Sequence, residues 1–411
     1  MRRHLDDALG RIALAAAFVA VHAVLIVLLW TDPHAPFNDV IGVYRDWVAA
    51  GVETGRWVGI AVPFVYPPLA LAPMLVAGIA GVDAGAYGWA WLGLVVLLDA
   101  VAVLVLASRG DRGARRRGVL AAWWWLAFLL LTGPVALARL EAITAPIAII
   151  AVRLLLERPA IAGALLAAAA WMKIWPGALL AAAVVTLRAR WRVLASGLLA
   201  TAAVLLLWLA LGSRGELLGF LTGQTARSLQ VESLLAAPWL VAVALGAPGA
   251  EIVWNQELIT FEVSGPGVAE LAAWSTPLLL LGAIVVLLLG VLARRGGALA
   301  ALTLTSLGLA AVLVVTNKVG SPQFTVWLAA PVVLAILLAR RRGSMRDARA
   351  SLPAVIGLVI AGLTQLVYPS GYDLLLEAQP LMVLVLLVKH VLWLVLLGWS
   401  LAGLVRLARE R

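Results

Sequence analysis

The sequence predicts an all-α integral membrane protein, a polytopic helical bundle of roughly twelve transmembrane helices with short helices on its outer face. Of the 411 residues, 64% are hydrophobic and only 13% are charged, and the mean hydropathy is +1.04. Soluble domains carry about 45–50% apolar and ~25% charged residues. No water-soluble fold buries this much apolar surface, so lipid is the expected solvent. Long apolar runs separated by arginines predict the same class.

The apolar runs recur along the whole chain. A membrane span needs about 20 residues, with about 17 as the lower limit. Runs of this length, or nearly so, cover residues 12–31, 86–107, 119–136, 139–156, 193–211, 271–292, 298–316, 324–340, 352–368 and 379–405. The first run exceeds the ~7–15 apolar residues of a cleaved signal peptide, so we expect it to be a span.

Two shorter runs, 160–172 and 176–187, flank a break that contains Lys173 and Pro176. At ~1.5 Å per residue each covers under ~20 Å of a hydrocarbon core about 30 Å thick. We expect a helical pair whose tip ends inside an outward-facing cavity. An unpaired lysine is costly to bury, so Lys173 is a candidate to face water or bind an anion. Snorkelling to the membrane surface is the alternative.

Arginine placement sets the expected topology. If the short, proline-bearing runs 66–80 and 231–246 both crossed the membrane, ten arginines between residues 109 and 192 would face outward, against the positive-inside rule. We therefore expect both runs to lie at the outer surface or to re-enter. Twenty-three of 28 arginines then lie on the cytoplasmic side, together with both termini, and 14 of 21 acidic residues lie outside. The net charge of +10 thus indicates topology, and no nucleic-acid partner is expected.

We expect one membrane-embedded domain, 1–411, whose outer segments 32–85, 212–270 and 316–324 cover the bundle. The absence of cysteine excludes disulfides and thiolate metal sites. No two of the four histidines are spaced as metal ligands. We expect neither a metal nor another cofactor.

The first outer loop is rich in acidic side chains and follows directly on the first span, with His34, Asp39 and Asp46 among its polar residues. Residues 40–51 are expected to form a helix with Asp39 or Asn38 as its N-cap. A simple cap is one explanation of Asp39, and a catalytic carboxylate is the other.

In the second outer segment, Gln224, Arg227, either Gln230 or Ser228, and Glu232 are close enough in sequence to share one helical face. This face is either a binding surface or a plain amphipathic helix.

Two more polar groups interrupt the apolar pattern. Segment 316–324 contains Asn317, Lys318 and Gln323, and an ordinary polar turn is its alternative explanation. Lys389-His390 lies inside the last span, where we expect a partner within the bundle.

The outer segments therefore hold few candidate bases and several separated cations. A single base, together with cations that bind an anion, suits attack on a carbon that bears a phosphate leaving group. The carboxylate takes the proton of the incoming hydroxyl, and the cations offset the charge on the departing phosphate. A double displacement by paired carboxylates has less support, because no motif places a second acid.

Five segments in this order resemble glycosyltransferase family 87, a multispan bacterial family of the GT-C fold. They are the first loop from Asp39 to Tyr44, Tyr66-Pro67-Pro68-Leu69, Lys173 with Pro176, Arg227 to Ser233, and Asn317-Lys318 with 321–327. The resemblance covers most of the chain.

The resemblance implies an inverting transfer of a sugar, in many members of the family mannose, at the outer face of the bacterial cytoplasmic membrane and usually without a metal. The donor is a polyprenyl-phosphate sugar and the acceptor a glycolipid or polysaccharide. The family's catalytic base matches Asp39. Asp46 is the alternative base, because Asp39 and Tyr44 are five residues apart where about four are expected. The substrate-binding candidates are Lys173, Arg227 and Lys318, near the donor phosphate, with Glu232, Asn317, Gln323, Tyr44, Tyr66 and His34.

Three other functions compete with this one. Arabinofuranosyl or other pentosyl transfer would use the same mechanism. A transporter or flippase of lipid-linked sugars is the second, although the halves 12–211 and 271–405 show no convincing repeat of the kind common in transporters. A structural membrane subunit is the third, and it leaves the first-loop acids unexplained.

Overall fold

The computed structural model describes residues 2–108, 111–213, 215–222, 227–339 and 348–410, which fold as a helical bundle with one two-stranded sheet. The first half comprises α1 (Arg2–Thr31), η1 (Asp39–Tyr44), α2 (Arg45–Thr54), η2 (Pro68–Ala70), α3 (Leu71–Gly78), α4 (Ala84–Ser108), α5 (Arg112–Thr132), η3 (Pro134–Ala136), α6 (Glu141–Leu154), α7 (Pro159–Ala170), α8 (Pro176–Thr186) and α9 (Arg190–Ala210).

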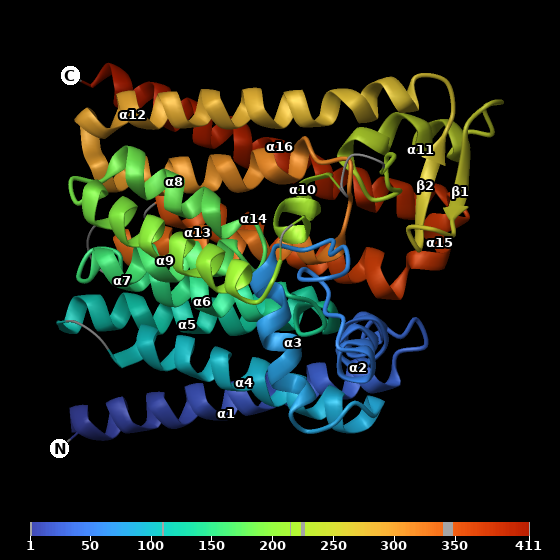
Figure 1. The fold of residues 1–411 in the computed structure, drawn as a ribbon. Coiled ribbons are helices and arrows are strands. Elements are labelled where there is room, and N and C mark those ends of the chain that lie inside the picture. Colours follow the sequence, from blue (N-terminus) through green and yellow to red (C-terminus); the bar gives the residue numbers. More distant parts are fainter. Residues whose placement is uncertain (1, 109–110, 214, 223–226, 340–347, 411) are drawn as a thin grey trace.

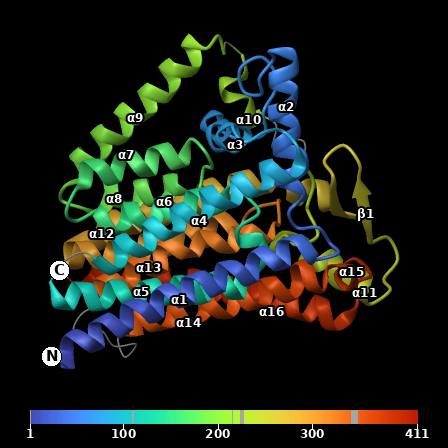
Figure 2. The same ribbon diagram turned by 90° about the horizontal axis from the view of Figure 1, so that it is seen from below.

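The second half comprises η4 (Glu216–Leu218), α10 (Gly219–Thr222), η5 (Leu234–Ala236), α11 (Ala237–Ala244), β1 (Glu251–Asn255), β2 (Thr260–Ser264), α12 (Val268–Val315), η6 (Pro322–Leu328), α13 (Ala329–Leu338), α14 (Ala348–Gln365), η7 (Leu366–Ser370), α15 (Tyr372–Leu376) and α16 (Pro380–Arg409). Figure 1 shows the long helices side by side, with both termini at one end and the sheet at the other. Figure 2 shows α9 and α7 on the opposite side of the bundle from α14 and α16.

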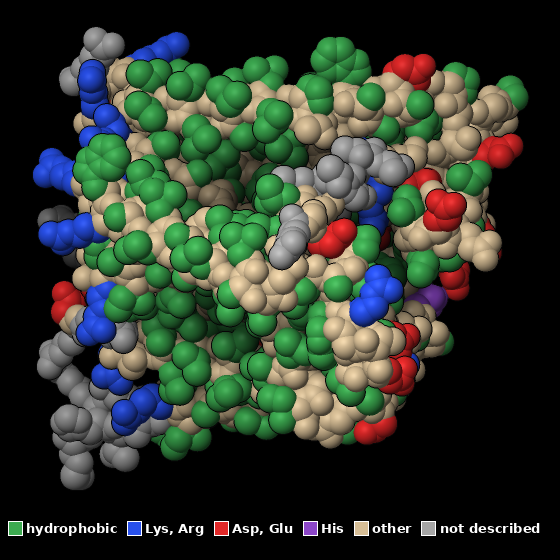
Figure 3. Space-filling view, viewed as in Figure 1, with side chains coloured by type: hydrophobic (Ala, Val, Ile, Leu, Met, Phe, Trp, Pro, Cys, Tyr) green, Lys and Arg blue, Asp and Glu red, His purple; other side chains and the backbone are tan. Residues whose placement is uncertain are grey.

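Charge is divided between the two ends of the bundle. Lys and Arg side chains gather at the end that holds the termini, whereas most Asp and Glu side chains lie at the opposite end (Figure 3). Hydrophobic side chains cover the visible face between them. This distribution is typical of a bundle that crosses a membrane. We call the two ends the basic end and the acidic end.

Six described helices are long and apolar enough to cross a membrane. They cover Leu9–Thr31, Ala84–Ser108, Arg190–Ala210, Val268–Val315, Ser351–Ser370 and Pro380–Arg409. The chain is therefore a helical membrane protein. The prediction of roughly twelve spans is not confirmed, because several apolar runs form shorter helices, among them α6 with 14 residues.

Helix α12 holds two of the expected spans in one 48-residue element that folds back at Gly297. Its two halves pack antiparallel. A side chain at Gly290 would overlap Thr305, and one at Gly282 would overlap Val312. Glycine at these positions therefore permits the close approach of the two halves.

The expected helical pair is present as α7 and α8, of 12 and 11 residues. Both fall short of the length that crosses a bilayer. Gly163 of α7 lies against Val193 and Ser196 of α9, which fixes the pair against its neighbour. The turn between α7 and α8 carries Lys173.

The acidic end contains an element that the sequence did not predict. Strands β1 and β2 form an antiparallel hairpin, from the pair Glu251–Ser264 to the pair Asn255–Thr260. The segment 229–231 runs along β2 and exchanges backbone hydrogen bonds with it. A second hydrophobic cluster, separate from the bundle core, includes Leu229, Val231 and Val263 and joins this end to α16. Short helices such as α11 and α15 are present at this end, and the hairpin adds to them.

Candidate functional site

Asp39 is the first residue of η1, a π-helical turn that continues directly into α2. Asn38 occupies the N-cap position, but its side chain makes no capping hydrogen bond. The Asp39 carboxylate pairs instead with Arg139, whose Nε lies 2.8 Å from Oδ2. The explanation of Asp39 as a simple cap is therefore wrong. Its side chain is 40% exposed, so this carboxylate is anchored and still open to solvent.

The π-helical turn accounts for the unexpected spacing of Asp39 and Tyr44. A π-helix closes its hydrogen bonds over five residues, one more than an α-helix. Tyr44, five residues after Asp39, ends the same turn. Burial is the main cause that raises the pKa of the Tyr44 phenol, and the Asp39 carboxylate raises it further. The two residues thus stay close despite the extra residue.

Arg139 was not among the predicted site residues. It precedes α6 and is 8% exposed. One terminal nitrogen donates to the carbonyl oxygens of Pro36 (2.6 Å) and Ala138 (2.7 Å), while Nε faces Asp39. The Tyr368 side chain also lies near Arg139. The guanidinium therefore joins the first outer loop to the turn before α6 and to η7.

Lys173 lies at the tip between α7 and α8, with a side chain that is 16% exposed. Its Nζ is 3.5 Å from Oε1 of Glu141 and 4.5 Å from the centroid of the Tyr66 ring, a cation–π contact. Burial is the largest single influence on the pKa of Lys173 and lowers it, but Glu141 and the weaker contributions of its other neighbours together raise the pKa. Asp39 acts on it in the same direction. Because Lys173 has buried partners, snorkelling does not describe it.

Glu141 was also missed. It begins α6 and is 1% exposed. Its Oε1 accepts a hydrogen bond from the Trp327 indole at 3.2 Å and faces Lys173. Its Oε2 has no hydrogen-bond partner among the described residues. A buried carboxylate oxygen without a partner is unusual and calls for an explanation. We refer to Asp39, Arg139, Glu141, Lys173 and Tyr66 as the Asp39 cluster.

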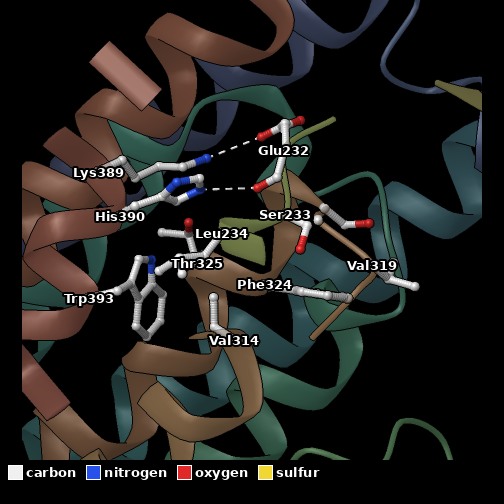
Figure 4. Close-up of a pocket in the computed structure, with 12 residues that line it drawn as sticks. Glu232, Ser233, Leu234, Val314, Val319, Phe324, Thr325, Lys389, His390 and Trp393 are labelled. Atoms are coloured by element: carbon white, nitrogen blue, oxygen red, sulfur yellow. Dashed lines mark hydrogen bonds and ion pairs between the residues drawn. The ribbon is translucent and has the colours of Figure 1, made fainter. Parts of the chain in front are cut away.

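Glu232 belongs to a different group of charges, the Lys389 cluster, shown in Figure 4. Lys389 Nζ lies 3.1 Å from Glu232 Oε2, and His390 Nε2 lies 3.1 Å from the Glu232 backbone carbonyl. The expected partner of Lys389-His390 is thus Glu232, on a segment far away in sequence. A cavity of about 20 Å³ adjoins all three residues and has room for about one water. Glu232 serves here as a counter-ion inside the bundle.

Lys318 and Arg227 meet in a third group, the Lys318 cluster, together with Glu262. Lys318 is 9% exposed. Burial lowers its pKa, repulsion by Arg227 lowers it further, and Glu262 opposes both. Of the three cations predicted to lie near the donor phosphate, Arg227 and Lys318 therefore lie near each other, whereas Lys173 belongs to the Asp39 cluster. Glu262, which the sequence did not single out, accepts hydrogen bonds from the Ser228 backbone and the Asn255 amide.

The segment around Arg227 is not the expected helix. Helix α10 ends at Thr222, and Gln224 lies outside the described residues. Gln230 forms an antiparallel bridge with Glu262, so Arg227, Gln230 and Glu232 do not share a helical face. Spacing of three to five residues was misleading here, because an extended segment also satisfies it.

Asn317 lies in an ordinary polar turn, the alternative explanation given for segment 316–324. Its Oδ1 accepts a hydrogen bond from the Val319 backbone, and its carbonyl accepts one from the Ser233 hydroxyl. The adjacent Gly320 lies against the backbone of residues 232 and 233 so closely that a side chain there would overlap it. Gln323 lies half-buried in the first turn of η6.

Two predicted first-loop residues lie in other surroundings. His34 bridges Asp32 and Asp373, at 3.2 and 3.1 Å, and so ties the first loop to α15. Asp46, the alternative base, is 62% exposed and pairs with its neighbour Arg45. Asp39, and not Asp46, faces the buried basic side chains.

The predicted residues Asp39, Lys173, Tyr66, Glu232, Arg227 and Lys318 thus fall into the three clusters, and the other predicted residues lie outside them. Tyr368 of η7 lies near residues of both the Asp39 and the Lys389 clusters, namely Arg139, Asp39 and Glu232. Within the part of the chain that the structure describes, no three His, Cys, Asp or Glu side chains are grouped as metal ligands. The Asp39 cluster combines a solvent-open carboxylate, two cations and an unsatisfied acid, which makes it the best candidate for an active site.

Comparisons with known protein families, with curated proteins and with solved structures found no match. The class of the protein, a helical membrane bundle, is thus defined by its own helices and charge distribution.

Proposed function

We propose that this protein is an inverting glycosyltransferase that moves a sugar from a polyprenyl-phosphate donor to a glycan or glycolipid acceptor. The observation that carries the proposal is the position of Asp39, which is held by Arg139 near Lys173 and keeps 40% of its side chain exposed. The positive-inside rule assigns the basic end to the cytoplasm, and the acidic end with Asp39 then faces outward.

In the proposed reaction, the acceptor hydroxyl oxygen attacks the anomeric carbon as the bond from that carbon to the phosphate oxygen breaks. The Asp39 carboxylate takes the hydroxyl proton. Arg139 fixes the orientation of this carboxylate through Oδ2. Displacement from the face opposite the leaving group inverts the anomeric centre. The polyprenyl phosphate leaves with the bonding electron pair.

The departing phosphate needs positive charge in a site from which water is largely excluded. Lys173 supplies it in the Asp39 cluster, and Glu141 keeps its ammonium protonated by raising the pKa of Lys173 against the effect of burial. Arg227 and Lys318 are a second cationic pair at the same end of the bundle. From the resemblance described above, mannose is the proposed sugar.

The test is a transfer assay with purified protein in lipid vesicles, a radiolabelled polyprenyl-phosphomannose donor and candidate glycolipid acceptors. Asp39→Asn keeps the shape of the side chain and removes its basicity. We expect it to lower the transfer rate by about 10²–10⁴-fold, the range typical of general-base loss. The melting temperature and membrane insertion of the variant are measured in parallel to exclude misfolding.

Asp46→Asn is the matched control, since Asp46 lies in the same loop but is exposed and bound to Arg45. It should retain near-normal transfer. The proposal fails if Asp39→Asn is active, and loss of activity in Asp46→Asn alone moves the base to that residue. Movement of intact labelled donor across the vesicle membrane, with no sugar on any acceptor, identifies a flippase. A polyprenyl-phosphoarabinofuranose donor tests pentosyl transfer in the same way.

A further inference from the structure

A large cavity lies at the basic end of the bundle, away from all three charge clusters. Its volume is about 800 Å³. It opens between the ends of α6, α8 and α13, the fold-back of α12 at Gly297 and the last turns of α16. This volume is within the ~300–1,000 Å³ of sites that hold small molecules.

The lining of this cavity is mainly aliphatic. Leu155, Leu187, Ala335 and Leu407 are buried side chains of the wall, and Trp399 is partly buried beside them. An apolar space of this size is a poor site for ordered water, which needs two to four polar partners. In a membrane-embedded bundle, the apolar molecules at hand are the acyl chains of lipids.

The rim of the cavity differs from its wall. Arg188, in the turn between α8 and α9, lines the cavity with an exposed side chain at the end where arginines gather. Glu410 lines it from the end of α16. An arginine at the opening of a pocket between membrane helices, on the positive side of the membrane, suits an anionic lipid head group. Because Glu410 repels anions, the phosphate would lie on the Arg188 side of the opening.

We propose that this cavity binds an anionic membrane phospholipid, with one acyl chain inside the cavity and the phosphate group at Arg188. The site is separate from the proposed active site and does not depend on the proposed function. The lipid would fill the space between the fold-back of α12 and the ends of α13 and α16. The basic end would then be stabilised by a bound lipid that the acidic end does not contact.

The test is native mass spectrometry of the purified full-length chain in detergent, titrated with phosphatidylglycerol or phosphatidylcholine of the same acyl composition. We expect one phosphatidylglycerol molecule to be retained per chain, and we expect phosphatidylcholine to bind more weakly. Arg188→Gln should weaken phosphatidylglycerol binding about five-fold, as expected for one basic residue at a lipid surface. Arg192→Gln is its control, because Arg192 is exposed nearby and does not line the cavity.

Ala300→Phe tests the acyl-chain part by filling the cavity, since Ala300 lines it from the returning half of α12. We expect loss of the retained lipid with little change in melting temperature. Ala273→Phe, at an exposed position of the same helix, is the control. Equal retention of both lipids by the parent protein, or full retention by both Arg188→Gln and Ala300→Phe, would overturn the proposal. Should Ala300→Phe fail to fold, Arg188→Gln against Arg192→Gln decides the outcome alone.

Discussion

Two buried sets of charged side chains in this protein differ in how completely their polar atoms are paired. In the middle of the bundle, Asp99 of α4 accepts hydrogen bonds from His22 of α1 and from the Trp125 indole of α5. The second ring nitrogen of His22 lies 2.9 Å from the Phe18 carbonyl oxygen, so each polar atom of this set faces a polar neighbour. In the Asp39 cluster, one oxygen of Glu141 has none among the described residues, and Asp39 is open to solvent.

The difference separates a structural role from a functional one. A buried polar network that is fully paired rigidifies the helices it joins, because leaving any member unpaired is costly. A network with an unpaired oxygen and an open carboxylate is incomplete in the free protein, and a substrate can complete it. We infer that the Asp99 set holds α1, α4 and α5 together, whereas the Asp39 cluster is arranged to bind another molecule.

The largest expected effect on stability is at Asp99. Asp99→Ala leaves the His22 ring and the Trp125 indole without their partner, so we expect a loss of about 2–3 kcal/mol in the free energy of unfolding. Transfer activity per folded molecule should not change. Unfolding in a graded denaturing detergent measures the first quantity, and the vesicle assay measures the second.

A double variant, His22→Leu with Asp99→Leu, removes both polar partners from the bundle. It should recover much of the lost stability, because a buried pair replaced by apolar residues is often tolerated. If Asp99→Ala instead abolishes transfer in a protein of normal stability, the contrast between the two sets of charges is wrong.

Glu141→Gln tests the functional role of the Asp39 cluster. The amide keeps the shape of the side chain but removes the charge that raises the pKa of Lys173 against burial. We expect a roughly ten-fold slower transfer at pH 8, about 1.4 kcal/mol, with little loss of stability. Since the pKa of Lys173 falls in the variant, its activity should decline at lower pH than that of the parent. Glu270→Gln, an exposed change at the start of α12, should leave the pH profile unaltered.

The smallest effect is expected at His34. The hydrogen bond to Asp373 is the main cause that raises the pKa of His34, and Asp32 adds to it against the effect of burial. A raised folded-state pKa stabilises the protein fully below the unfolded value of ~6.5 and ceases to do so as pH rises through the folded value. His34→Gln should therefore reduce stability more at pH 5.5 than at pH 8.5. Melting temperatures at both values measure this, and an equal reduction at both would contradict the assigned ion pairs.

The sequence predicted the helical membrane class because apolar content and run length are local properties. It also predicted the short pair α7 and α8 around Lys173. The hairpin of β1 and β2 was missed, since no span-length pattern marks 251–264 and the segment depends on pairing with 229–231. The predicted number of spans is not confirmed, because helices such as α6 are buried by neighbours and do not need to match the membrane thickness.

For the candidate site, sequence reasoning selected Asp39 and Lys173 but not the residues that hold them. Arg139 and Glu141 lie at the start of an apolar run and look like ordinary loop charges. Arg139 reaches Asp39 only because α1 and α6 place them together, a tertiary contact between residues 100 positions apart. An intramembrane lysine at 389 did indicate a partner, yet nothing local identifies Glu232 as that partner.

The fold-back of α12 makes the two halves of one helix unequal in their surroundings. Residues 301–312 of the returning half are all buried, whereas much of the half before Gly297 is exposed. The outgoing half is thus suited to partition into the bilayer unaided, and the returning half completes its burial only against other helices. During biogenesis, insertion of the exposed outgoing half would therefore bring the buried returning half into the membrane with it. Gly282 and Gly290 would set the register in which the two halves pack.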